Sequence, residues 1–216
     1  MPPVNPGLTR SARDLRTGGV AAWLARGRAL QACGRSVATT TSCRSVPVYP
    51  STVLADVIGD ELRVLFCGIN PGLMSAVRGQ HFARPGNRFW PALHLSGFTP
   101  RQLRPDEQAE LLTYRLGITN VVDRPSARAD ELTRAEYVAG GQNLVEKVLH
   151  YRPEWLAVVG VTAYRDAFGE RTARMGKQDR MIGETRVWIL PNPSGLNAHY
   201  TLPKLADAFA ELERVS

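Results

Sequence analysis

The sequence predicts an α/β fold with a mainly parallel sheet that carries helices on both faces. Two observations lead to this prediction. From Leu54 onward, short apolar runs alternate with segments that have helix signals, and this alternation is typical of parallel strands joined by helices. Each apolar run is also short and bounded by turn residues, as buried strands are. The length of 216 residues suits one domain with a sizeable core, with room for an appendage.

Four strands follow from the apolar runs. The first run, "RVLFCGI", stops at the polar turn Asn-Pro-Gly, and Cys67 near its end is interpreted as a buried small hydrophobe. The predicted strands cover residues 63–69, 118–122, 155–160 and 186–190.

Five helices follow from capping and termination signals. Pro105 stands at a first-turn position before two acidic residues, which favours a helix start. Thr133 and Glu136 have the spacing of a capping box, so a helix is predicted there despite Gly140 and Gly141. The predicted helices cover residues 87–97, 105–117, 133–150, 162–169 and 202–215.

The basic charge is concentrated at the N-terminus. Residues 1–50 contain seven arginines and one acidic residue, so they carry +6 of the formal net charge of +7. Their Pro, Gly, Ser and Thr content is typical of a segment that buries little apolar surface. We predict a mostly disordered basic arm over residues 1–50 and one domain over residues 51–216. A translation start assigned too far upstream is the alternative explanation of the arm.

Several functional classes are disfavoured by the composition. The sequence has no apolar run of about 18 residues and no long apolar segment near its start, so neither a membrane span nor secretion is expected. The three cysteines lack CxxC spacing, which suits a reducing cytoplasm and disfavours a four-cysteine metal site. We therefore expect a cytoplasmic protein.

Two strands end in similar polar turns. "GINPG" (68–72) follows the first strand, and "PNPSGLN" (191–197) follows the last. The carboxyl ends of parallel strands border the functional cleft of such sheets, so both turns are expected to face one cleft. Asn-Pro is also ordinary turn chemistry. Neither turn has the pattern of a phosphate loop, which argues against a nucleotide-binding domain of another kind.

Other polar residues near these turns have open roles. His81 and His199 fall in loops and are candidate functional residues, whereas His94 and His150 fall within helices and are interpreted as structural. Arg124, which follows the 118–122 strand, either pairs structurally or lines the cleft.

Four motifs in this order resemble the mismatch-specific uracil-DNA glycosylases, a family that includes thymine-DNA glycosylases. They are "GINPG", "HFARPGNRFW" (81–90), "ITNVVDRP" (118–125) and "PNPSGLN". The resemblance spans residues 63–212 and implies a three-layer α/β/α sandwich around a central, mainly parallel sheet. It also implies excision of uracil, and in some members thymine, opposite guanine, without a metal or cofactor.

The resemblance assigns roles around the extruded base. Asn70 matches the asparagine that positions the attacking water, and Phe82 matches an aromatic residue that stacks on the base. Ile69 falls where the pyrimidine edge is read, and Ser75 falls near the reacting sugar. Asn120 stands where some members have lysine and thymine-specific members have asparagine, which leaves the choice between uracil and thymine open.

The second turn matches the loop that enters the duplex. Gly195, Leu196 and Asn197 correspond to residues that wedge into the stack and contact the widowed guanine. An apolar wedge such as Leu196 can replace the stacking that a flipped base gives up. Some members have arginine where this chain has Ala198, so His199 or a nearby arginine is expected to supply that contact.

The sequence therefore predicts a monofunctional DNA N-glycosylase that acts as a monomer on double-stranded DNA with mismatched or damaged bases. The alternative is a mismatch-binding protein with little turnover, because asparagine is a weak catalytic group.

Overall fold

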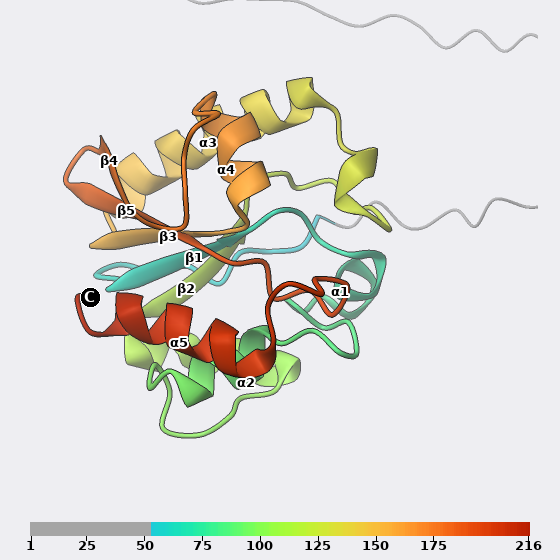
Figure 1. The fold of residues 1–216 in the computed structure, drawn as a ribbon, viewed down its shortest axis with the longest axis vertical. Coiled ribbons are helices and arrows are strands. Elements are labelled where there is room, and N and C mark those ends of the chain that lie inside the picture. The colour runs from blue at the N-terminus through green and yellow to red at the C-terminus, as the bar shows by residue number, and fades with distance from the viewer. Residues whose placement is uncertain (1–52) are drawn as a thin grey trace, which may run out of the picture. The chain divides into compact units, whose positions relative to one another are not determined.

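The computed structural model describes residues 53–216, and the predicted basic arm over residues 1–50 lies outside them. The described part forms three layers around a five-stranded sheet of order β2-β1-β3-β5-β4. Helices α3 and α4 cover one face of the sheet, and α2 and α5 cover the other (Figure 1). The predicted three-layer α/β/α sandwich is confirmed.

Four strands of the sheet are parallel and one is antiparallel. Each parallel strand is a mostly apolar run that is largely buried on both faces, as expected under two helical layers. Their carboxyl ends share one edge, where Gly68 pairs with Asn120. The strands are β1 (Val64–Gly68), β2 (Leu116–Asn120), β3 (Trp155–Val159), β4 (Gly176–Ile182) and β5 (Thr185–Leu190).

The sequence analysis missed β4. This strand, "GKQDRMI", runs antiparallel to β5 at the edge of the sheet, and six of its seven residues alternate between half-buried and exposed. An edge strand with charged outward residues has little apolar signal, and such charges keep other chains from pairing with the edge.

The helices agree with the predicted segments, with three differences. Neither α1 nor η2 was predicted, and the 105–117 segment forms a 3-10 helix that ends three residues early. The chain turns at Arg115, whose φ of 57° is left-handed, so β2 begins at Leu116. The helices are α1 (Leu73–Arg78), α2 (Phe89–Leu95), η1 (Pro105–Tyr114), η2 (Ala129–Glu131), α3 (Arg134–Tyr151), α4 (Val161–Phe168) and α5 (Leu202–Glu213).

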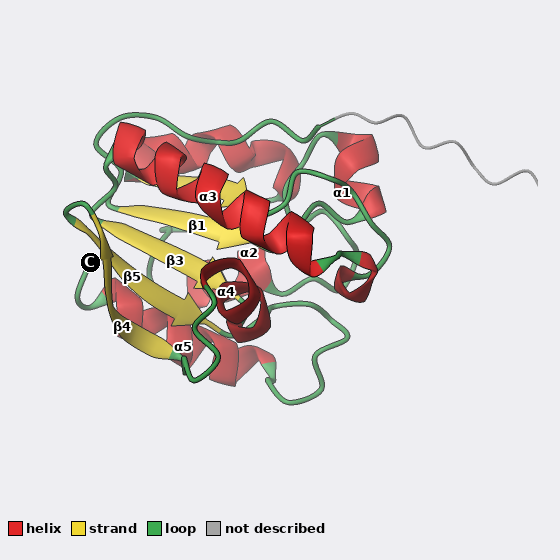
Figure 2. Cartoon of the chain, turned by 90° about the horizontal axis from the view of Figure 1, so that it is seen from above, coloured by secondary structure: helices red, strands yellow, loops and turns green. Residues whose placement is uncertain are grey.

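Two glycines let α3 pack closely. A Cβ at Gly140 would lie 2.1 Å from the carbonyl oxygen of Val121, and one at Gly141 would lie 2.5 Å from that of Ala167 in α4. Neither contact is possible for a larger residue without moving backbone. The helix-weakening glycines of this segment thus fix α3 against the strand end and α4 (Figure 2).

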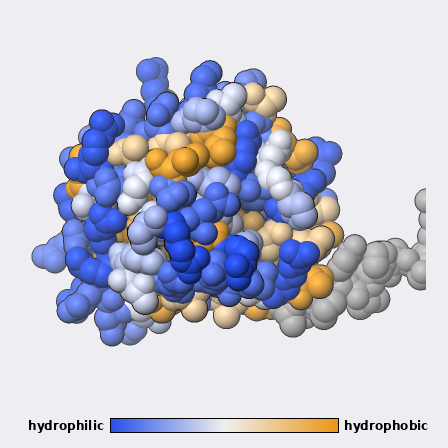
Figure 3. Space-filling model, turned by 90° about the horizontal axis from the view of Figure 1, so that it is seen from below, coloured by the Kyte–Doolittle hydropathy of each residue, from blue (hydrophilic) through white to orange (hydrophobic). Residues whose placement is uncertain are grey.

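The core lies in two parts, one on each side of the sheet. Cys67 is fully buried as predicted, and burial raises the pKa of its thiol. Outside, the face on the side of α2 and α5 is mostly hydrophilic, with apolar groups in separate patches (Figure 3). Within residues 53–216, no helix is both long and apolar enough to cross a membrane.

Candidate active site

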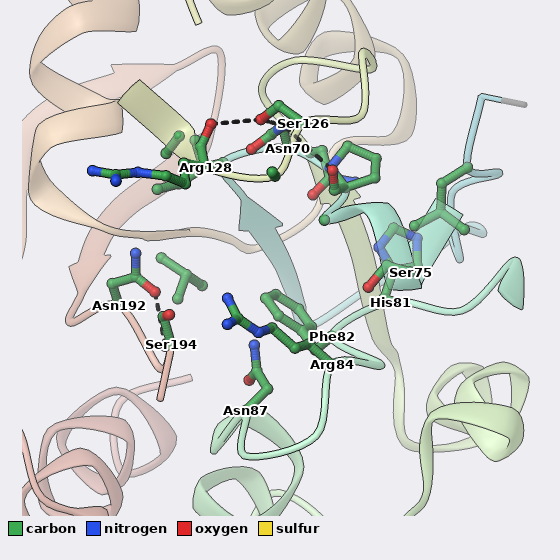
Figure 4. A pocket seen from close by; sticks show the side chains of 18 residues that line it. Asn70, Ser75, His81, Phe82, Arg84, Asn87, Ser126, Arg128, Asn192 and Ser194 are labelled. Atoms are coloured by element: carbon green, nitrogen blue, oxygen red, sulfur yellow. Dashed lines mark hydrogen bonds between the residues drawn. The ribbon is translucent and has the colours of Figure 1, made fainter. Parts of the chain in front are cut away.

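Both Asn-Pro turns line one pocket at the carboxyl edge of the sheet. Its volume is about 140 Å³. Asn70 with Ser126 lies on one side, Asn192 with Ser194 on a second, and Phe82 on a third (Figure 4). The expectation that the two turns face one cleft is therefore confirmed.

The side chain of Asn70 is oriented by its amide nitrogen. Nδ2 donates to Ser126 Oγ at 2.8 Å, to the Arg124 carbonyl at 3.0 Å and to the Pro71 carbonyl at 3.3 Å. The Ser126 hydroxyl donates its only proton to the Arg128 carbonyl, so toward Asn70 it can only accept. Three acceptors around one end of the amide identify that end as nitrogen. Within residues 53–216 the amide oxygen has no hydrogen bond, so it can accept one from a water in the pocket.

The loop that holds Asn70 is itself tied to α3. The Arg124 guanidinium donates to both carboxylate oxygens of Glu136, at 2.5 and 3.2 Å, and to the Glu131 carbonyl at 3.0 Å. Glu136 also completes the predicted capping box with Thr133. Of the two roles left open for Arg124, the structure shows the structural pairing, while its backbone carbonyl helps to orient Asn70.

Phe82 and Asn120 meet over Gly68. A Cβ at Gly68 would lie 2.6 Å from Asn120 Oδ1 and 3.3 Å from the Phe82 ring, so only glycine leaves both side chains in place. Phe82 has a left-handed φ of 53° and stacks on Phe89 at 4.0 Å between ring centroids. Strained backbone of this kind is often found at functional sites. Both Phe82 and Asn120 line the pocket.

Ser75 and His81 shape the segment that carries Phe82. The Ser75 hydroxyl accepts from the backbone N–H of Ala83 at 3.1 Å. His81 is buried, its Nε2 lies 3.0 Å from the Ala55 carbonyl, and burial lowers the pKa of its imidazole. A nitrogen that faces a carbonyl must carry the proton, so His81 is a neutral donor there. Both residues border the pocket, and both have hydrogen bonds that stabilise the loop.

The pocket offers no strong base. Among the described residues, no aspartate, glutamate or lysine lines it. Its two arginines differ. Arg128 is paired with Asp130, whereas Arg84 is exposed and its guanidinium has no hydrogen bond or ion pair within residues 53–216. The described part also holds no group of three or more His, Cys, Asp or Glu residues that could bind a metal.

The loop after β5 is held by Arg88, at the start of α2. Its guanidinium donates to the carbonyls of Pro193, Ser194, Asn197 and Tyr200, and its backbone N–H donates to the Pro193 carbonyl at 3.0 Å. One guanidinium therefore fixes the loop from its first turn to its last.

The tip of this loop projects away from the core. Leu196 is 71% exposed, although it is a large apolar residue. A Cβ at Gly195 would lie 2.7 Å from the Gly86 carbonyl oxygen, so the tip lies close against the segment before α2. The Asn197 side chain instead bonds within the loop, to Asn192 and to the N–H of His199. His199 is exposed on the same loop.

Several residues of this site were missed by the sequence analysis. Asn192 had a signal, since it is the asparagine of the second Asn-Pro turn. Ser126 had none, because it lies 56 residues from the amide that it orients. Arg84 and Arg88 stand inside a motif that was noted only for Phe82.

Comparison with known protein families gives one match that covers most of the chain. A model of the uracil DNA glycosylase superfamily matches residues 55–213, which is nearly all of the described part. The chain belongs to the uracil DNA glycosylase superfamily. Membership supports a hydrolase that removes uracil from DNA in DNA repair.

This uracil DNA glycosylase superfamily domain is also similar to a solved structure. The NMR structure of a candidate uracil DNA glycosylase from Methanosarcina acetivorans aligns with a TM-score of 0.48 and 19% identity. The alignment covers 74% of this chain and 96% of that chain. Similarity at this level carries no argument about substrate, so the membership rests on the family match.

Proposed function

We propose that this protein is a monofunctional, mismatch-specific DNA glycosylase that flips out and excises uracil opposite guanine and leaves an abasic site. The observation that carries the proposal is Asn70. Its amide nitrogen has three acceptors, and its oxygen is left for a water in a pocket that neighbours an exposed apolar loop tip.

The pocket chemistry favours a dissociative cleavage. A neutral amide orients a water but does not remove a proton strongly. The C1′–N1 bond therefore breaks with its electron pair leaving on uracil, and the held water then adds to C1′ and loses a proton. Hydrogen bonds to the departing anion carry most of the stabilisation. The absence of lysine from the described pocket lining supports a water nucleophile and a monofunctional enzyme.

The pocket walls suit a flipped pyrimidine. Phe82, backed by Phe89, offers a ring for stacking, and Ile69 borders the same pocket. Asn120 is a buried residue whose amide has no side-chain hydrogen bond within residues 53–216, and it has both a donor and an acceptor for a pyrimidine edge. Ser75 stabilises the wall that holds Phe82.

The loop after β5 is the proposed wedge. Flipping a base costs a few kcal/mol of unstacking, less for a mismatched base, and an apolar side chain inserted in the stack offsets part of this cost. Leu196 is exposed on a loop that Arg88 holds in shape. We expect the backbone at Gly195 and Asn197, on either side of Leu196, to contact the opposing guanine. Arg84, at the pocket and without a carboxylate partner, is our candidate for the contact missing at Ala198.

The rival function is a mismatch-binding protein with little turnover, and the neutral pocket is the feature that favours it. Excision from G·U, G·T, A·U and single-stranded uracil oligonucleotides, measured in single and multiple turnover, tests both. We expect rapid excision from G·U and slower excision from A·U, with G·T reporting on thymine. Equal rates on G·U and A·U would contradict mismatch specificity, and absence of excision in single turnover would favour the binding protein.

A further inference from the structure

Three arginines without a carboxylate partner in the described part lie around α4. This helix is on the face of the sheet opposite to α5, the helix that follows the wedge loop (Figure 1). Arginines elsewhere on the surface often have carboxylate partners, as Arg101 has Glu107 and Arg115 has Glu154. Arg134, Arg165 and Arg171 have no carboxylate within 4.0 Å in the described part of the chain. We call these three residues the arginine patch.

The arginine patch lines a cavity of about 330 Å³ between the start of α3 and α4. Arg134 and Arg171 are exposed at its rim. Arg165 is half-buried, and its Nε and Nη2 both donate to the Ala173 carbonyl, at 3.0 and 2.6 Å. Asp166 is the one carboxylate among the cavity's lining residues. The cavity therefore has an excess of positive charge and one guanidinium already held in place.

The arginine patch is connected to the candidate active site. A neighbouring cavity of about 520 Å³ shares Asn192 and Ile69 with the active-site pocket, and it shares Thr162 and Asp166 with the patch cavity. Three hollows thus follow one another from the carboxyl edge of the sheet to the α3–α4 groove. A ligand that runs past the active-site pocket along them meets three guanidinium groups.

We propose that the arginine patch binds phosphates of the DNA strand that flanks the flipped base. The proposal rests on the proposed function, since it takes DNA as the substrate. Guanidinium groups bind phosphate in a bidentate manner, and phosphate contacts position a protein on a duplex without reading sequence. The DNA backbone carries a phosphate at every nucleotide, so a strand whose base enters the pocket can also present phosphates to the arginine patch.

The test compares two double variants of the full chain. Arg134→Gln with Arg171→Gln removes two charges from the patch. The matched control, Arg152→Gln with Arg214→Gln, removes two exposed arginines that also lack carboxylate partners in the described part. They follow the ends of α3 and α5, away from the carboxyl edge. Affinity for a uracil-free duplex is measured over a range of salt concentrations.

We expect the patch variant to bind the duplex more weakly. A plot of the log of its binding constant against log salt concentration should be less steep than that of wild type by about 1.8, at roughly 0.9 per phosphate contact. Arg134→Lys with Arg171→Lys should restore most of the slope, because the charge returns. A patch variant that matches wild type, or a control that changes as much as the patch variant, would overturn the proposal. Uracil excision by wild type is assayed separately, so failure of the glycosylase function is distinguishable from failure of the patch.

Discussion

At the scale of single residues, the site depends on which atoms remain available after the fold has taken its hydrogen bonds. Asn70 gives its nitrogen to three acceptors and keeps its oxygen. Asn197 commits both ends of its amide to the loop after β5. The same residue type, in two similar turns, is therefore oriented toward the pocket in one and shapes the loop in the other.

Leu196 is a large apolar residue on the surface, and the proposed wedge role accounts for its exposure. We expect Leu196→Ala to lower excision from a G·U duplex by roughly tenfold to a hundredfold, because the wedge offsets part of a few kcal/mol of unstacking. Excision of an unpaired uracil in a bulge or single strand should fall much less. Single-turnover rates on the two substrates measure the difference, and a uniform loss on both would contradict the role of Leu196 as a wedge.

At the scale of elements, two ionic groups hold the active-site loops. The first is the contact from Arg124 to Glu136, which joins the loop after β2 to the start of α3, and the backbone of that loop orients Asn70. Hydrogen bonds from Arg124 and from Thr133 lower the pKa of Glu136 from 4.5 to about 2. The folded state binds this proton less readily than the unfolded state. Its contribution to stability is therefore present above pH 4.5 and is lost as the pH falls toward 2.

Glu136→Gln should remove this pH dependence. The variant should melt at a lower temperature than wild type at pH 6, and the difference should shrink between pH 4.5 and pH 2. Thermal melts over this range measure it. Glu211→Gln serves as the control, since Glu211 is exposed and has no ion pair in the described part. A constant difference at all pH values would show that the charge of Glu136 is not what stabilises the loop.

The second ionic group is Arg88, which positions the wedge loop. We expect Arg88→Gln to leave loop carbonyls without donors and to reduce stability by about 1–3 kcal/mol. Excision from the G·U duplex should fall more than excision of an unpaired uracil, because only the duplex needs a rigid wedge. Arg88→Lys should recover part of the duplex rate. Equal losses on both substrates, without recovery by lysine, would mean that Arg88 stabilises the fold only.

At the scale of the whole molecule, the sequence predicted what local pattern determines. Apolar runs predicted the four buried parallel strands. The capping box of Thr133 and Glu136 correctly predicted the start of α3. The edge strand β4 escaped because its charged residues resemble a loop. The hydrogen bonds from Asn70 to Ser126 and from Arg88 to Tyr200 were missed because they join residues far apart in sequence, which spacing does not reveal.

The central claim is that Asn70 Oδ1 holds the water that adds to C1′ when the glycosidic bond breaks. The most direct test is the single-turnover excision rate of Asn70→Ala on a G·U duplex, with mismatch affinity measured on the same protein. The account predicts a loss of roughly a hundredfold or more, since each 1.36 kcal/mol of barrier is about a factor of ten, with mismatch affinity largely retained. Excision at the wild-type rate by Asn70→Ala would contradict it.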